Sequence, residues 1–127
     1  MDFDWQRGAL AEGLACYRSG EFFLAHEHWE SVWLRAPGAE KTFLQALIQT
    51  TVAFHHLQMS NTAGAASLMQ RALRKLKPYP DAFGGIAVRA LREDLERCLL
   101  DLEQGRTALP AMSPRIEPFC APAEPGI

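Results

Sequence analysis

The sequence has few cysteines, little net charge and no long apolar run. Its three cysteines, Cys16, Cys98 and Cys120, are odd in number and far apart. They fit neither a disulfide framework nor the closely spaced pairs of a zinc site, so a reducing cytoplasm is the default compartment. A formal net charge of −2 over 127 residues gives no reason to expect nucleic acid as the main partner.

Segments that direct a chain to a membrane are also missing. The N-terminus, MDFDWQRG, has acids and an arginine where a signal peptide would need an apolar stretch. The most apolar run, FLQALIQTTVAF, contains glutamines and is too short to span a bilayer. We therefore expect a soluble, cytoplasmic protein without a membrane partner.

Common catalytic signatures are absent as well. The chain has no Gly-rich phosphate loop, no nucleophile elbow and no Ser, His and Asp order typical of a hydrolase. No segment alternates between apolar and polar residues over a useful length, so no β-sheet is predicted. The whole sequence contains 48% hydrophobic and 22% charged residues. This composition is typical of one globular domain.

Glycine and proline divide the chain into five segments with helical periodicity. Asn61 or Thr62 can cap the fourth segment, and Gly20, Pro78 and Gly105 are natural stops. The expected helices cover about residues 4–19, 21–35, 39–59, 62–77 and 86–104. Short loops between them favour an all-α, mostly antiparallel five-helix bundle over residues 1–104. The proline-rich C-terminal tail, 105–127, is expected to be extended or disordered, with room to lie over the bundle.

The second expected helix contains the stretch AHEHWESVW, residues 25–33. At about 100° per residue, His28 points roughly 160° away from His26, so the two histidines cannot line one site. The residues within roughly 60° of His26 on either side are Phe22, Phe23, Trp29, Glu30 and Trp33. Four exposed rings would promote aggregation, so we expect this arc to face the core.

His26 and Glu30 are four residues apart and can pair on this helix. If buried, they also need polar partners, because an unsatisfied polar group costs about 1–3 kcal/mol. The third expected helix carries such groups within an arc of roughly 40°. We therefore predict a polar cluster between two antiparallel helices, made of His26, Glu30, Gln45, Gln49 and His56.

The runs GEFFLAHEHWESVW and FLQALIQTTVAFHHLQMSN resemble the signature of the domain-of-unknown-function 309 family, which comprises small, all-helical, mostly prokaryotic proteins. The resemblance covers roughly residues 3–104 and is specific between about 20 and 61. Ala46 departs from it, since the family often has glycine there. The positions that match the family pattern are His26, Glu27, Glu30, Trp33, Leu47, Ile48, Gln49 and His56. The resemblance implies a helical fold and no assigned activity.

Three functions are compatible with the cluster. The first is a structural hydrogen-bond network that sets helix register. The second is a metal-assisted hydrolase in which His26, Glu30 and His56 bind zinc or another divalent metal, an established three-ligand type. However, HEHWE has Glu30 where the zincin motif requires histidine. Glu27 lies at the edge of the arc, where it could act as a base or be solvated.

The third function is a pocket for a small ligand or a protein partner, lined by the aromatic rings and the polar cluster. Glutamine suits this role, because it orients ligands by hydrogen bonds but neither titrates nor binds metal well. We favour this binding or interaction module, without a cofactor, and leave an enzyme or a structural adaptor as alternatives. The candidate site is His26, Glu27, Glu30, Trp33, Gln45, Gln49 and His56.

A basic face on the fourth expected helix is a weaker feature. It contains Arg71, Arg74, Lys75 and Lys77, and Arg89 and Arg92 could extend it. A solvated surface explains such a run better than contact with RNA does. Nothing in the sequence sets the oligomeric state.

Overall fold

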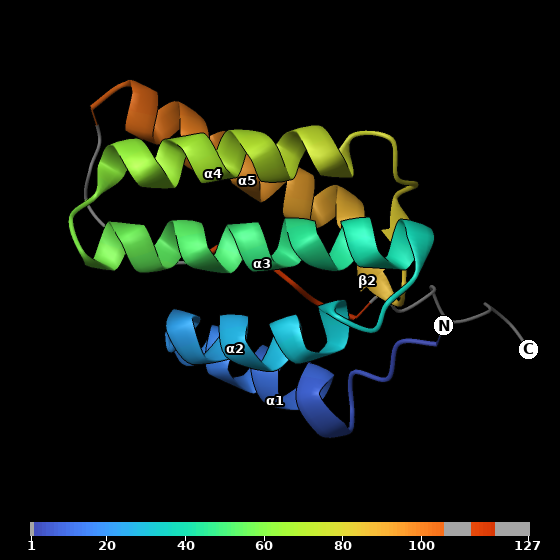
Figure 1. Cartoon of the computed structure of the whole chain (residues 1–127). Helices are drawn as coiled ribbons and strands as arrows, with labels where there is room; N and C mark the ends of the chain where they lie inside the picture. Colours follow the sequence, from blue (N-terminus) through green and yellow to red (C-terminus); the bar gives the residue numbers. More distant parts are fainter. Residues whose placement is uncertain (1, 106–112, 119–127) are drawn as a thin grey trace, which may run out of the picture.

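A computed structural model describes residues 2–105 and 113–118 of the chain, and it contains five α-helices (Figure 1). The helices are α1 (Gly8–Arg18), α2 (Phe22–Trp33), α3 (Gly38–Gln58), α4 (Thr62–Leu76) and α5 (Val88–Glu103). Two short strands, β1 (Ala82–Phe83) and β2 (Ile86–Ala87), precede α5. The predicted five-helix, all-α architecture is confirmed, and each helix begins and ends close to its expected residue.

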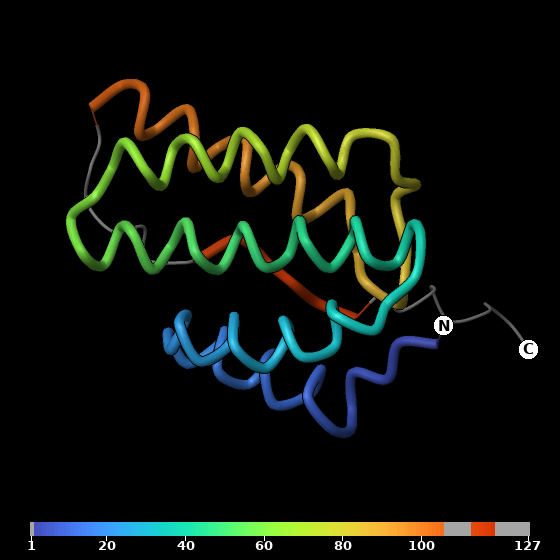
Figure 2. Tube along the Cα trace, in the orientation of Figure 1, coloured from blue at the N-terminus to red at the C-terminus, as the bar shows by residue number. Residues whose placement is uncertain are grey.

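Each helix packs mainly on its neighbour in the sequence. The main helix contacts join α1 to α2, α2 to α3, α3 to α4, and α4 to α5. As a result α3 lies in the middle, with the α1–α2 hairpin on one side and the α4–α5 hairpin on the other (Figure 1). The tube view shows that α1 and α5 lie on opposite sides of this central helix (Figure 2).

The hydrophobic core is built from the inward face of every helix. Trp29 is fully buried, and its indole Nε1 donates to the carbonyl of Leu10 at 3.2 Å. Trp5 packs edge-on against Trp29 and donates to the carbonyl of Gly84 at 2.7 Å, so the N-terminal segment ties α2 to the β-hairpin. Other enclosed core residues are Phe43, Phe54, Leu44, Leu47, Met69, Leu76, Leu91 and Leu95.

Cys98 is buried in the core. Burial raises the pKa of its thiol to about 11, which keeps it protonated at neutral pH. Cys120 lies outside the described residues.

The prediction of no β-structure was wrong in one place. Strands β1 and β2 pair antiparallel, with Ala82 opposite Ala87 and Phe83 opposite Ile86. Gly84 and Gly85 form the turn, with φ of 57° and 78°, which fits a tight hairpin turn that needs two left-handed residues. Strands of two residues are too short to produce an alternating pattern, so the Gly-Gly pair was the only available signal.

The arc around His26 was expected to face the core, and this was only partly correct. Phe22 and Trp29 are buried, whereas the side of the arc that contains Phe23 faces solvent and that ring is 52% exposed. The buried stripe of α2 is narrower than the aromatic arc, because α1 and α3 cover the side marked by Ala25 and Trp29.

Asn61 caps α4, as the sequence predicted. Its side-chain oxygen accepts a hydrogen bond from the backbone N–H of Gly64 at 3.0 Å, which satisfies one of the free donors at the helix N-terminus.

Replacing Asn61 by alanine should lower the free energy of unfolding by about 1 kcal/mol, because that donor loses its partner. Urea denaturation of Asn61→Ala and of the unmodified chain measures the difference. Asn61→Asp keeps the capping oxygen and is the matched control, expected to retain most of the stability. Equal midpoints for Asn61→Ala and the unmodified chain would contradict the capping role.

Within the C-terminal tail, residues 113–118 are extended and lie against the bundle. Pro114 and Ile116 are buried there, and Ile116 is only 2% exposed. The remainder of the 105–127 tail, apart from Gly105, lies outside the described residues, and the boundary between domain and tail stays a prediction.

Candidate functional site

His26 and Glu30 form a close side-chain pair on α2. The imidazole Nε2 lies 2.7 Å from a carboxylate oxygen of Glu30, the spacing expected for residues four apart. The side chains of His26 and Glu30 are 24% and 47% exposed. The pairing is therefore confirmed, but its predicted burial away from water was wrong, because this edge of α2 is left partly uncovered.

The second nitrogen of His26 is the less usual feature of this pair. If Nε2 carries the proton that bonds to the carboxylate, Nδ1 of the neutral ring is an acceptor. Nδ1 is buried and has no hydrogen-bond partner among the described residues. The exposed ring of Phe23 lies 5.7 Å from the imidazole and 5.5 Å from the ring of His55, so it bridges α2 and α3.

Trp33 lies at the other end of the same helix edge, seven residues after His26. Its indole Nε1 is also buried without a hydrogen-bond partner in the described part of the chain. The ammonium of Lys41, at the start of α3, lies 4.6 Å from the centre of the indole ring, a cation–π contact. We call this surface the α2–α3 edge; it consists of Phe23, His26, Glu30, Trp33, Lys41 and His55.

The two glutamines of α3 do not complete the predicted cluster. Gln45 and Gln49 are both partly buried. The side-chain oxygen of Gln49 is buried, and no described group donates to it. Within the described part of the chain, no hydrogen bond joins either glutamine to His26 or Glu30, so the amides do not satisfy the pair as expected.

His56 takes part in a different contact. Its Nδ1 lies 3.1 Å from the side-chain nitrogen of Asn61, the residue that caps α4. This contact uses His56 to connect the end of α3 to the start of α4. Within residues 2–105 and 113–118, no group of three His, Cys, Asp or Glu side chains is placed to hold a metal ion. The alternative ligand set of His26, Glu30 and His56 is therefore not assembled.

The remaining sequence candidates lie on outer surfaces. Glu27 is exposed on α2. His28 lies 3.3 Å from Glu12 of α1, which confirms that His26 and His28 point to different sides. On the basic face, Arg92 donates to two backbone carbonyls, of Leu76 and Tyr79. Its guanidinium therefore joins the end of α4 to α5 instead of extending a charged surface.

Sequence reasoning missed a second polar centre, around Asp94 of α5. The carboxylate is 4% exposed and accepts hydrogen bonds from Arg97, at 2.5 Å, and from Arg115. Burial alone would raise the pKa of Asp94, but the hydrogen bonds from the two arginines outweigh it and lower the pKa below its ordinary value. The available signal was a carboxylate within the apolar stripe formed by Leu91 and Leu95.

The fold defines an all-α protein made of successive antiparallel helical hairpins. Residues 10–68, from α1 into α4, match the family model described as Domain of unknown function (DUF309). The resemblance seen in the sequence, expected over roughly residues 3–104, is therefore confirmed over residues 10–68.

A curated relative is an uncharacterized protein of Aquifex aeolicus (strain VF5), to which the chain is 32% identical over 97 residues. The alignment covers 76% of this chain but 29% of that protein. The chain thus spans less than a third of the length of the relative that it matches. Among the helices described, none is both long and apolar enough to cross a bilayer.

Proposed function

We propose that this domain is a binding module and that the α2–α3 edge takes up a segment of a partner polypeptide. The observation that carries the proposal is the pair of buried, unpartnered nitrogens on that edge, His26 Nδ1 and Trp33 Nε1. They lie seven residues apart on one face of α2, about 10 Å along its axis. An acceptor and a donor at this spacing suit the alternating groups of a polypeptide backbone or a polar side chain.

A purely structural network would be expected to satisfy its own polar atoms. An unpartnered buried polar atom costs the free protein about 1–3 kcal/mol, and native proteins rarely leave several together. These atoms therefore weigh against the structural-network alternative. Both are shielded from solvent, so a partner bonds to them only after neighbouring side chains change rotamer, as is common at interfaces.

The apolar surface beside these atoms supports a polypeptide partner. On α2 and its C-cap, Phe23 and Leu34 are 52% and 63% exposed. Phe23 and Leu34 are eleven residues apart, about 16 Å along the helix axis. A surface of that length with both apolar and hydrogen-bonding groups matches a peptide segment better than a small molecule.

Site-specific photocrosslinking in the native host cells tests this function. A photoreactive phenylalanine analogue replaces Leu34, the C-cap of α2 that follows Trp33, and the matched control replaces Leu100, which is 50% exposed on α5. We expect a discrete adduct from position 34 that position 100 does not give. Adding Trp33→Phe, which keeps an aromatic ring but removes the donor, should reduce the adduct about fivefold, the effect of one hydrogen bond. Identical adducts from both positions would contradict the proposal.

The binding role also predicts a stability gain when an unpartnered group is removed. Gln49→Leu should raise the free energy of unfolding of the isolated chain by up to about 1 kcal/mol, because it removes a buried oxygen that no described group satisfies. Chemical denaturation measures the change. The matched control is Gln58→Leu in the same helix, since Gln58 donates to the carbonyl of Gly20 at 2.9 Å and its loss should not stabilise. A loss of stability in Gln49→Leu would instead favour the structural network.

A further inference from the structure

The first and last helices of the bundle are separated by an extended segment of the tail. We call residues 113–118 the strap. The strap crosses the face of the bundle opposite the viewer, behind α3, between α1 and α5 (Figure 2). Because α1 packs on α2 and α5 packs on α4, the strap occupies a groove whose two walls come from opposite ends of the domain.

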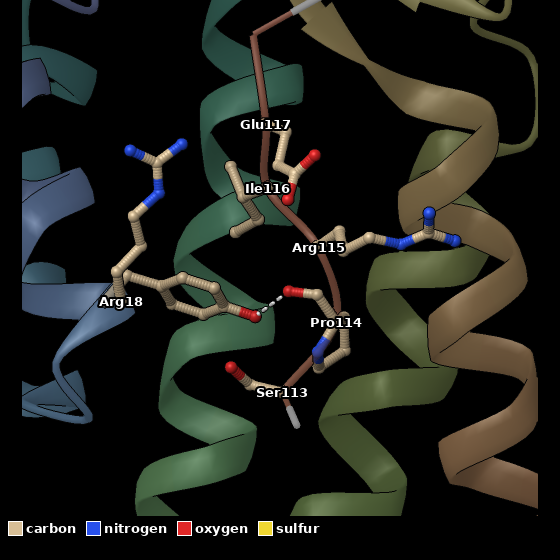
Figure 3. A pocket seen from close by; sticks show the side chains of 7 residues that line it. Arg18, Ser113, Pro114, Arg115, Ile116 and Glu117 are labelled. Atoms are coloured by element: carbon tan, nitrogen blue, oxygen red, sulfur yellow. Dashed lines mark hydrogen bonds between the residues drawn. The ribbon is translucent and has the colours of Figure 1, made fainter. Parts of the chain in front are cut away.

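Two groups of the groove donate hydrogen bonds to the backbone of the strap. The hydroxyl of Tyr17 donates to the carbonyl of Pro114 at 2.5 Å (Figure 3). The backbone N–H of Ala87 donates to the carbonyl of Glu117 at 2.9 Å, next to an antiparallel bridge between Ile86 and Pro118. Burial raises the pKa of the Tyr17 hydroxyl, so it remains a donor at neutral pH. Backbone contacts of this kind accept any extended chain, as in recognition by strand addition.

Two side chains of the strap are recognised individually. Asp94 receives the backbone N–H of Arg115 at 2.9 Å and two bonds from its guanidinium, Nε at 2.9 Å and Nη2 at 3.2 Å. In Figure 3, Ile116 points to the side of the strap opposite Arg115, and Ile116 is buried in the core. The groove therefore selects an arginine followed by a branched aliphatic residue.

The carboxylate of Asp94 keeps a charged partner when Arg115 leaves the groove. Arg97, three residues from Asp94 on the same helix, donates to the carboxylate at 2.5 Å, so Asp94 does not become an unpaired buried charge. Arg115 is itself 51% exposed and leaves directly into solvent. A cavity of about 280 Å³ lies beside the strap, bordered by Tyr17 and Arg18.

We propose that the α1–α5 groove is a docking site for an extended peptide of a partner protein that presents an arginine followed by a branched aliphatic residue, and that the strap is its intramolecular competitor. Residues 104–112 join the end of α5 to the strap. Because the strap and the groove belong to one chain, the strap competes as an intramolecular ligand. The apparent affinity for an external peptide is reduced by the fraction of molecules whose groove is free. This site is separate from the α2–α3 edge and does not depend on it.

The first test measures binding of a fluorescein-labelled peptide, Ser-Pro-Arg-Ile-Glu-Pro, which copies residues 113–118. Fluorescence anisotropy compares the full unmodified chain with the full-length double variant Arg115→Ala/Ile116→Ala. The double variant should bind the peptide at least about tenfold more tightly, because its own strap no longer competes. Arg71→Ala, an exposed arginine on α4, is the control and should not change the affinity.

The contact between the arginine of the peptide and Asp94 of the groove is tested by changing each of the two residues. A peptide with alanine in place of arginine should bind the double variant at least about tenfold more weakly, the effect of losing a charge-assisted, two-point contact. Asp94→Asn added to the double variant should weaken binding of the original peptide to a similar extent. Unchanged affinity in either case, or equal affinity of the double variant and the unmodified chain, would overturn the proposal.

The unmodified chain provides a test that does not depend on folding of the variants. Saturating peptide should speed amide hydrogen exchange in residues 113–118 as the strap is displaced, while exchange in α3 stays the same. Unchanged exchange in the strap would reject displacement. Sedimentation velocity tests whether a second copy of the chain fills the groove instead of a partner peptide. In that case the unmodified chain would be a dimer and Arg115→Ala/Ile116→Ala would be a monomer, which would overturn the proposal.

Discussion

Replacing Gly13 by alanine should destabilise the domain by about 2 kcal/mol, although alanine is the better helix former. Gly13 is buried in α1, and a Cβ there would overlap Nε1 of Trp29 and approach its Cδ1 to 2.5 Å. Helix propensity alone would favour alanine by about 1 kcal/mol. The indole, however, is fully buried and is held by its bond to Leu10, so it cannot move aside and overpacking dominates.

Chemical denaturation of Gly13→Ala measures the change in the free energy of unfolding. A decrease shows that overpacking dominates, and an increase shows that helix propensity does. Trp29→Phe, with its smaller ring, is the partner mutation in a double-mutant cycle. We expect Gly13→Ala to cost much less in the Trp29→Phe background than in the unmodified chain, which reports direct contact between the two positions. A stability gain in Gly13→Ala would show that α1 does not pack this closely on α2.

The second large effect is expected at Asp94. Asp94→Asn should lower the free energy of unfolding by about 2 kcal/mol at neutral pH, because hydrogen bonds to a buried charged group are among the stronger ones. The pH dependence follows from the lowered pKa of Asp94 in the folded chain. Its stabilisation is complete above the ordinary carboxyl pKa, 3.8, and is lost as pH falls through the lower folded-state pKa.

Denaturation curves of the unmodified chain and Asp94→Asn, recorded from neutral pH to below pH 3.8, test both parts. The stability difference should be constant near neutrality and shrink in acid, as the carboxylate of the unmodified chain becomes protonated. Glu93→Gln, a mostly exposed carboxylate paired with Arg89, is the matched control and should have little effect. A difference that persists unchanged in acid would show that the charge of Asp94 is not what stabilises the strap.

The helices were predictable because their signals are local. Asn61 supplies a capping oxygen for α4, and glycine or proline follows four of the five expected helices, so most helix ends can be read within a few residues. The pairing of His26 with Glu30 was equally local, since one turn of helix brings the two side chains together. The hairpin around Gly84 and Gly85 escaped notice because two-residue strands carry no periodic pattern.

The predicted polar cluster was wrong in the contact between the second and third helices. Helical periodicity correctly placed Gln49 and His56 on one face of α3, but it contains no information about which neighbouring helix covers that face. His56 contacts Asn61 at the start of α4 instead of Glu30 on α2. The strap was beyond sequence reasoning for the same reason, because Tyr17 and Pro114 are 97 residues apart.

The amino-acid sequence by itself determined the five helices, the cap of α4 at Asn61 and the likeness of residues 10–68 to the DUF309 family, since each depends on neighbouring residues or on a continuous pattern. Only the tertiary structure decided that the α2–α3 edge is half-exposed and that Asp94 and Tyr17 hold the strap. The physical reason is that burial and hydrogen bonding depend on what lies opposite a side chain, and that neighbour comes from a distant part of the chain.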